Sequence, residues 1–249
     1  DIILMVETYG SGPFIADYLN CNFHLVASKN TSLNDPSVNL SIFSKFPFGK
    51  RIDTEYPFYL GGIEIPINGK IIRFFSNWFH YLPWNNEPEK MGKSVEELLE
   101  WEKTESRHEM IQKVLPYLKK FANETDSIPM IFGGDMNSLS HLDWTNKTKT
   151  IHNNLVVPWN ATEILADLGL IDSYRKENPN PITHPGVTWD KKERKDSHRI
   201  DYIFYKGKSI KSIKSNSYNA YFNESIIIND KQIPYPSDHG IVVTTFEFR

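Results

Sequence analysis

The chain has 249 residues, of which 39% are hydrophobic, 24% charged and 13% aromatic, an ordinary globular composition that suits a sizeable core. Its formal net charge of −3 excludes tight binding of nucleic acid by a general basic field, although locally held metal ions let an acidic enzyme act on a polyanion. The single cysteine, Cys21, excludes an intramolecular disulfide and a cysteine metal cluster, and no apolar run reaches the ~18 residues of a membrane span.

The first third of the chain alternates apolar runs typical of strands with polar loops. The predicted strands are residues 1–6, 22–28, 40–43, 58–67 and 70–77, and the predicted helix is 14–19. The last two strands form a hairpin around Asn68-Gly69, a dipeptide that strongly favours a tight turn. Glu7 and His80 each follow a strand, where functional side chains often lie. A helix-capping Glu7 and an ordinary surface or core His80 are the structural alternatives.

The chain opens inside an apolar strand, DIILMVE. A domain that begins in this way is expected to have lost upstream sequence, together with any targeting segment. The absence of a visible signal peptide therefore leaves the compartment open, and a secreted or periplasmic protein is compatible with the sequence. The oligomeric state is open as well.

A long helix is predicted from residue 94 to about residue 121. Ser94 and Glu97 form a capping box at its start, and an amphipathic stripe of apolar residues follows. Pro116 indicates a kink or a break. The charged residues between 100 and 109 are interpreted as a solvated face without a function.

The most informative stretch is IPMIFGGDMNS, residues 128–138. A short buried strand over 130–132 is predicted to stop at Gly133-Gly134, because glycines permit a tight turn and close backbone approach. Asp135 and Asn137 then emerge at the strand end, where chemistry tends to occur in layered α/β folds. A carboxylate accepts a proton from water and a carboxamide donates to a developing oxyanion. A strand followed by an Asx turn is the structural alternative.

The last third of the chain contains a helix, loops and three further predicted strands. These elements are a helix at 161–167, loops at 172–185 and 191–195, and strands at 198–206, 209–221 and 241–248. Asp201 lies inside a strand, where a carboxylate is costly unless it is partnered. Asp238 and His239 stand together before the final strand. The basic loop KKERK suits contact with a phosphate, but a solvated tip is the simpler interpretation.

Polar residues thus gather at predicted strand ends. They are Glu7, Asp135, Asn137, Asp201, Asp238 and His239. Several carboxylates and an amide without cysteine suit a hard cation, Mg²⁺ or Mn²⁺, better than zinc. Crowded carboxylates repel one another unless a cation or a shared proton relieves them. A metal site with an adjacent histidine suits hydrolysis of a phosphate ester.

Four motifs resemble those of the endonuclease/exonuclease/phosphatase superfamily in order and spacing. They are ET after an apolar strand, GGDMNS, RIDYIF and SDHGIVV, and the resemblance covers nearly the whole chain. The superfamily includes pancreatic-type deoxyribonucleases, abasic-site endonucleases, neutral sphingomyelinases and inositol-polyphosphate 5-phosphatases. The resemblance implies an α/β (α+β) fold, a four-layer α/β/β/α sandwich of two packed mixed β-sheets flanked by helices, in a single domain over residues 1–249.

The resemblance also implies catalytic roles. Asp135 resembles the carboxylate that activates or orients water, and Asn137 the amide that steadies the phosphoryl oxygens. Asp201 resembles the aspartate that orients the catalytic histidine. His239 resembles that histidine, which contacts the scissile phosphate and balances charge in the transition state.

The metal ligands and the second histidine are implied in the same way. Glu7 and Asp238 resemble the metal-binding carboxylates. The family's N-T-H-L segment reads SNWFHYL here, so either a bulge restores His80 to the site or Phe79 takes its place. The superfamily strand that precedes Glu7, with an asparagine that helps to hold the metal, has no counterpart in this sequence.

Three residues are candidate substrate contacts: Trp189, Trp84 and Arg199. Trp189 in GVTWD resembles an aromatic that lines the substrate pocket in the family, and core packing is its alternative. Trp78, Tyr81 and Trp84 are candidates for an aromatic rim around a base, a sugar or an acyl chain, or they only anchor their loop.

These observations predict a divalent-metal-dependent phosphoesterase that hydrolyses a phosphodiester by water attack. A nuclease is the commonest expectation from the resemblance. A lipid, inositol or sugar phosphate stays an alternative substrate, because the net charge is −3 and no long basic groove is evident. A non-catalytic binding module that kept the fold is the alternative from another class.

Overall fold

The structure is a computed structural model, and it describes all residues except 83–86, 105, 190–197, 220–224 and 229. The strands are β1 Ile2–Met5, β2 Asn22–Val26, β3 Leu40–Ser44, β4 Arg51–Ile52, β5 Leu60–Ile67, β6 Lys70–Trp78, β7 Met130–Asp135, β8 Ile171–Asp172, β9 Asp201–Lys206, β10 Ile210–Tyr218, β11 Ser225–Ile228, β12 Lys231–Pro234 and β13 Ile241–Phe248. The helices are α1 Gly12–Leu19, α2 Val95–Lys103, α3 Ser106–Asn123, α4 Asn160–Asp167 and α5 Ser173–Glu177.

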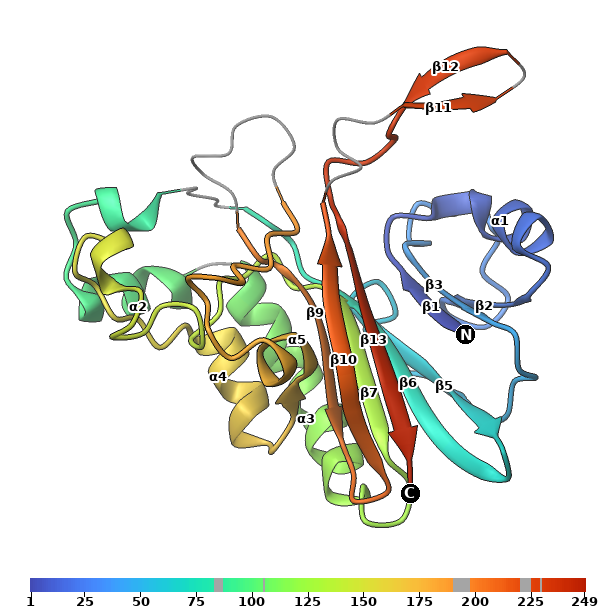
Figure 1. The fold of residues 1–249 in the computed structure, drawn as a ribbon. Helices are drawn as coiled ribbons and strands as arrows, with labels where there is room; N and C mark the ends of the chain where they lie inside the picture. Colours follow the sequence, from blue (N-terminus) through green and yellow to red (C-terminus); the bar gives the residue numbers. More distant parts are fainter. Residues whose placement is uncertain (83–86, 105, 190–197, 220–224, 229) are drawn as a thin grey trace.

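A six-stranded mixed sheet forms the centre of the molecule (Figure 1), in the order β4-β5-β6-β7-β9-β8. Only β6 and β7 run parallel, and the other neighbours are antiparallel. Parallel neighbours need a long crossover, and α2 and α3 provide it between β6 and β7. The crossover carries the chain back so that β7 ends beside the end of β6.

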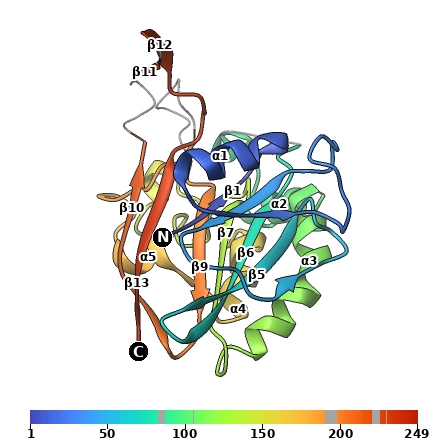
Figure 2. The same cartoon turned by 90° about the vertical axis from the view of Figure 1, so that its right-hand side faces the viewer.

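Helices cover one face of this sheet and strands cover the other. Met110, Val114 and Leu118 of α3 pack with Phe75 and Phe132 of the sheet in one buried cluster. The opposite face packs on two strand groups, β1-β3-β2 and β10-β13. Figure 2 looks onto this side of the sheet, with α1 and β1 in front, β10 and β13 at the left, and β9, β7, β6 and β5 across the centre.

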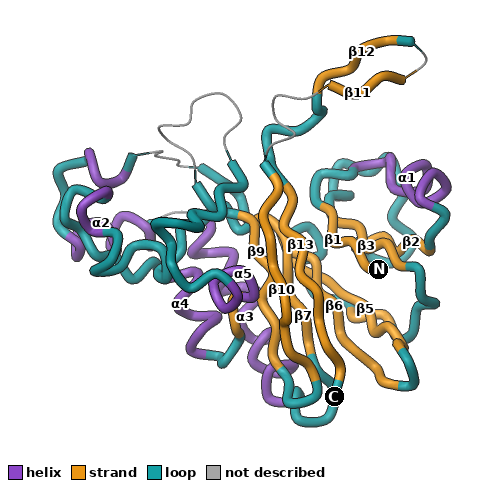
Figure 3. Tube along the Cα trace, in the orientation of Figure 1, coloured by secondary structure: helices purple, strands orange, loops and turns teal. Residues whose placement is uncertain are grey.

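The predicted α+β sandwich of packed strand layers flanked by helices is confirmed. Figure 3 shows α2, α3 and α4 on one side of the strands and α1 on the other. In the second strand layer, the described strands form two separately hydrogen-bonded groups instead of one sheet. The β11–β12 hairpin stands away from the body (Figure 1). Within the described residues, no helix combines the length and apolar character needed to cross a bilayer.

Local sequence signals predicted several elements correctly. The hairpin turns at Asn68-Gly69, both with positive φ, and Ser94 and Glu97 form both hydrogen bonds of the capping box. The long helix is instead two helices, α2 and α3, and Pro116 lies inside α3 without ending it. The predicted loop at 172–185 contains α5, because the side chain of Asp172 caps a short turn of helix.

The prediction that the strand stops at residue 132 is wrong. β7 runs through Gly133 and Gly134 to Asp135. A Cβ on Gly134 would lie 2.0 Å from the Asn77 carbonyl oxygen of β6, and one on Gly133 would lie 3.0 Å from the Tyr202 carbonyl oxygen of β9. The two glycines are therefore needed for close strand contact and do not end the strand.

Candidate active site

Asp135 and Asp201 face each other across two central strands. Asp135 is the last residue of β7, Asp201 is the first of β9, and the two are direct partners in the antiparallel register. Alternation along the strands places both side chains on the same face as Ile131 and Ile203, which pack toward the second strand layer. Like charges directly opposite each other are destabilising, so this pair requires a compensating group.

His239 supplies that compensation from the segment before β13. Its Nδ1 lies 2.9 Å from Oδ2 of Asp201. Burial opposes a charge on the imidazole, but the Asp201 carboxylate and its hydrogen bond, with help from Asp135 and Asp238, outweigh it and raise the pKa of His239 to about 10. His239 is therefore an imidazolium at neutral pH, held by Asp201.

Asp135 is the most deeply buried acid of the cluster, with 3% of its surface exposed. Burial raises its pKa well above the usual range, and the charges of Asp201 and Glu7 act in the same direction, while His239 and the Asn137 backbone amide act against it. A carboxyl group whose pKa is raised in this way is typical of functional sites. The charge of Glu7 reaches Asp135, so these residues belong to one region of the molecule.

Asn137 fixes the side chain of Asp135 by hydrogen bonds. Its backbone N–H donates to Asp135 Oδ1 at 2.8 Å, and its side-chain amide donates to Asp135 Oδ2 at 2.6 Å and to the Phe79 carbonyl at 2.7 Å. Both amide hydrogens of Asn137 are therefore donated within the protein. This arrangement differs from the predicted direct contact with phosphoryl oxygens, and it makes Asn137 a support for Asp135.

Glu7 is exposed at the end of β1 and has a left-handed backbone, with φ of 54°. Its N–H donates to Oδ1 of Asn39, a residue that is 1% exposed. Thr8 N–H donates to the Asn39 carbonyl, and the Asn39 amide reaches the Phe58 carbonyl. Asn39 therefore fixes the turn that presents Glu7, and the sequence interpretation missed it.

Asp238 and Trp189 contact each other beside His239. The indole N–H of Trp189 donates to Asp238 Oδ2 at 3.2 Å. Asp238 is exposed and Trp189 is half-buried. Trp189 thus lies next to the candidate site, as its predicted role in the pocket requires.

His80 follows β6 at the same end of the sheet. Phe79 is fully buried in the core under the helices, Trp78 packs in the opposite apolar layer, and His80 follows them after the strand has ended. The His80 ring stacks on Tyr81 at 4.8 Å and meets Trp78 edge-on at 5.6 Å. Trp78 is 6% exposed, which places it in the core and not on a rim.

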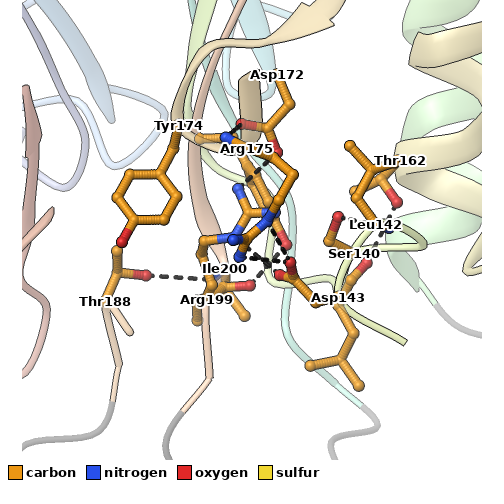
Figure 4. Close-up of polar contacts among 12 residues, drawn as sticks. Ser140, Leu142, Asp143, Thr162, Asp172, Tyr174, Arg175, Thr188, Arg199 and Ile200 are labelled. Atoms are coloured by element: carbon orange, nitrogen blue, oxygen red, sulfur yellow. Dashed lines mark hydrogen bonds and ion pairs between the residues drawn. The ribbon is translucent and has the colours of Figure 1, made fainter. Parts of the chain in front are cut away.

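Arg199 lies in the interior, which does not fit the predicted contact with substrate. Its guanidinium pairs with Asp143 at 2.8 Å and with Asp172 at 2.6 Å, and Arg175 pairs with the same Asp143. Figure 4 shows this cluster between Tyr174 and Asp143. The two aspartates hold Arg199 so firmly that its pKa is raised although burial acts to lower it. Trp84 and the KKERK loop lie outside the described residues.

Two buried charged residues of the helices support the Asp135–Asn137 loop. Glu102 and Arg107 are 1% and 4% exposed, and Arg107 donates to the Asn137 carbonyl. The interpretation of residues 100–109 as a purely solvated face is therefore wrong for these two. The local sequence shows only a charged helix, and burial of these residues follows from packing against a distant loop.

The cluster has the composition of a divalent-cation site. The ligand atoms of Asp135, Asp201 and His239 lie within 4.8 Å of one another, and neither Glu7 nor Asp238 belongs to this group. Burial is the main cause of the raised pKa of Asp135, the charge of Asp201 adds to it, and a cation would relieve the repulsion between the two carboxylates. The two carboxylates suit a hard divalent cation, whereas His239 as an imidazolium would lie beside the ion without binding it.

Known structures share this fold. The chain aligns over 100% of its length with 84% of truncated TDP2 from Caenorhabditis elegans, at a TM-score of 0.58 and 15% identity. An AP endonuclease from Archaeoglobus fulgidus aligns over 99% of this chain and 89% of its own, at 0.56 and 17%. An endonuclease/exonuclease/phosphatase family protein from Leptotrichia buccalis aligns over 100% and 88%, at 0.51 and 18%.

Sequence comparison finds a relative without a described activity. An uncharacterized protein of Caenorhabditis elegans is 33% identical over 144 residues, which are 54% of this chain and 46% of that protein. The match thus spans about half the length of that relative. No family model matches the sequence.

Proposed function

We propose that this chain, which has the fold of the endonuclease/exonuclease/phosphatase superfamily, is a divalent-metal-dependent hydrolase of phosphodiester bonds. One observation carries the proposal. Asp135, Asp201 and His239, which are far apart in the sequence, place their ligand atoms within 4.8 Å of one another at one end of the central sheet. A cluster of this kind, with a carboxyl group of raised pKa beside an imidazolium, suits phosphoryl transfer to water.

His239 is proposed to contact the scissile phosphate. Its Nδ1 is bound to Asp201, so Nε2 is the nitrogen that remains for a phosphoryl oxygen. Because its pKa is raised to about 10, the ring brings a positive charge to the site at neutral pH. That charge would stabilise the negative charge that develops on the equatorial oxygens.

Asp135 is proposed to accept a hydrogen bond from the attacking water. Asn137 fixes both of its oxygens by hydrogen bonds, which leaves the carboxylate little freedom to rotate. The carboxylates of Asp135 and Asp201, with Glu7 beside them, would hold the metal, because the protonated ring of His239 offers no lone pair to a cation. When bound, Mg²⁺ or Mn²⁺ would supply positive charge to the non-bridging oxygens and the leaving group.

A nucleic acid is the first substrate to test. One TDP2 structure contains a single-stranded DNA product. The net charge of −3 keeps a phospholipid, an inositol phosphate or a sugar phosphate as the second substrate class, because the chain has no general basic field. Two exposed rings, Tyr81 stacked on His80 and Tyr9 close to Glu7, suit either a base or an acyl chain.

The proposal is tested by incubating the chain with plasmid DNA, sphingomyelin and phosphorylated inositols, each with Mg²⁺ and with EDTA. We expect turnover of one class in Mg²⁺ and none in EDTA. His239→Ala and Asp135→Asn should each lower kcat by at least about 100-fold. Asp126→Asn, at an exposed surface ion pair, serves as the matched control and should keep full activity. Equal turnover in all variants would refute the proposal.

Calorimetry distinguishes the hypothesis of an enzyme from that of a non-catalytic binding module with the same fold. Titration with Mg²⁺ or Mn²⁺ should give specific heat in the wild type and none in Asp135→Asn. An inert scaffold should give no specific metal heat in either protein, and no hydrolysis of any substrate.

A further inference from the structure

Thr188 is a fully buried residue that contacts both segments of the candidate catalytic pair. Its exposed fraction is 0%. Its hydroxyl oxygen accepts the backbone N–H groups of Ile200 and Asp201, each at 3.1 Å. Its own carbonyl accepts the N–H of Gly240 at 2.6 Å, and its N–H donates to the His198 carbonyl at 2.9 Å. Figure 4 shows Thr188 beside Ile200, next to the arginine cluster.

These bonds join two parts of the chain that share no strand ladder. Asp201 begins β9, which pairs with β7 and β8, whereas His239 and Gly240 precede β13, which pairs with β10. Among the described strands, no ladder therefore fixes Asp201 relative to His239. Thr188 does so at backbone level, because one oxygen binds the amide of Asp201 and the other binds the amide that follows His239.

The residues behind Thr188 hold it in place. Gly186 has a positive φ of 70°, and a Cβ there would lie 2.3 Å from the Tyr174 ring. Tyr174 and Arg199 are both buried, and Arg199 is fixed by Asp143 and Asp172. The buried arginine cluster thus provides a rigid support for the segment that carries Thr188.

The hydroxyl of Thr188 is needed as a hydrogen-bond acceptor, and not only to fill space in the core. A valine side chain has nearly the same shape, but it would leave the amides of Ile200 and Asp201 without their acceptor inside the protein. An unsatisfied buried donor is costly, so these amides would move toward other partners. Asp201 would move with them, whereas a serine at this position would retain the acceptor.

We propose that Thr188 is a positioning residue that sets the alignment of the Asp201 carboxylate with the His239 imidazole. The proposal rests on the proposed function, because it assigns Thr188 to the same catalytic pair. A displacement of a catalytic group by about 1 Å can slow an enzyme by about 100-fold. Thr188 would then act on kcat through Asp201 and His239 without touching the substrate.

The test compares Thr188→Val with Thr188→Ser, using the full chain and the phosphodiester substrate that the wild type hydrolyses. Thr188→Val should lower kcat by about 10- to 100-fold with KM within about twofold, and Thr188→Ser should restore kcat to within about threefold of the wild type. If Thr188→Val does not fold, as judged by circular dichroism, Thr188→Ala replaces it in the comparison. Equal kcat in Thr188→Val and the wild type, or equal losses in the valine and serine variants, would overturn the proposal.

A second readout does not depend on turnover. In EDTA, the Nδ1–H proton of His239 should give a protected nuclear magnetic resonance signal in the wild type and in Thr188→Ser, because it is bonded to Asp201. The signal should exchange with water in Thr188→Val. If the wild type hydrolyses no phosphodiester, the proposed function fails, and this signal still decides whether Thr188 aligns the pair. An unchanged signal in Thr188→Val would contradict the alignment.

Discussion

At the scale of single residues, the charge of His239 depends on its partners more than on its own chemistry. Burial lowers the pKa of an imidazole, yet the pKa of His239 is raised to about 10, because three acids surround it. Asp201 is both the nearest partner and the largest favourable contribution. The other two acids, Asp135 and Asp238, act through charge alone.

Asp201→Asn should therefore lower the pKa of His239 substantially. Asparagine keeps the size of the side chain and one hydrogen-bonding oxygen, but it removes the charge that outweighs burial. Titration of the imidazole by nuclear magnetic resonance in EDTA measures the shift directly. Asp238→Asn is the matched control and should give a smaller decrease, because Asp238 is the weakest of the causes. Equal shifts in the two variants would contradict this assignment.

The sequence predicted which side chains lie in the candidate active site, but it did not predict which residues each of them contacts. An apolar strand followed by a carboxylate indicated a functional position for Asp135, and a carboxylate inside a predicted strand indicated that Asp201 needs a partner. The partners of Asn137 and Arg199 were not predictable from neighbouring residues. Phe79, Asp143 and Asp172, which fix them, lie between 27 and 58 positions away in the sequence.

At the scale of elements, β7 occupies a narrow space between β6 and β9. Gly134 has a φ of 148°, and a Cβ on it would lie 2.0 Å from the backbone of Asn77. Gly134→Ala should therefore push β7 away from β6 and displace Asp135, which is the next residue. We expect a loss of roughly 3 kcal/mol or more in the free energy of unfolding, measured by urea denaturation.

Gly92→Ala provides the control for this variant. Gly92 also has a positive φ, 67°, but its Cβ would meet nothing within 4 Å. The control should lose only the backbone strain of about 1 kcal/mol. A similar loss in both variants would show that φ alone, and not the contact with β6, requires glycine at 134.

The helices, strands and turns that could be predicted are those specified by residues close together in the sequence. The Asn68-Gly69 turn and the Ser94 capping box depend on residues within four positions, and the final strand was predicted with its observed bounds. The extension of β7 through its glycines depends on the neighbouring strands, and α5 depends on a cap that the proline-rich loop obscured. Short elements such as β4 gain their stability from tertiary packing, so they have no clear local signal.

At the scale of the whole molecule, the candidate site exists only where three strand groups meet. Glu7 comes from the group of β1, Asp135 and Asp201 from the central sheet, and His239 from the group of β13. The apolar layer between these groups therefore sets the geometry of the site. Leu4 and Phe246 pack into this layer beside Ile131 and Ile203.

The same layer contains a histidine that should make stability depend on pH. His24 of β2 points inward with Val26 and is 9% exposed. Burial, together with the charge of Arg51, lowers its pKa from 6.5 to about 4. The unfolded chain therefore binds a proton below pH 6.5 while the folded chain does not, so stability present above pH 6.5 is lost as the pH falls toward 4.

Urea denaturation of the wild type and of His24→Gln across this pH range isolates the effect. Glutamine does not titrate, so the variant should lack the loss of stability that His24 causes, which we expect to be about 3 kcal/mol for full protonation. Asp135 and Glu102 have raised pKa values and shift stability in the opposite direction, but they are present in both proteins and cancel in the difference. The free-energy difference between the two proteins should therefore change steadily from pH 6.5 to 4 and be constant above 6.5. A difference that does not vary with pH would mean that His24 is protonated inside the folded layer.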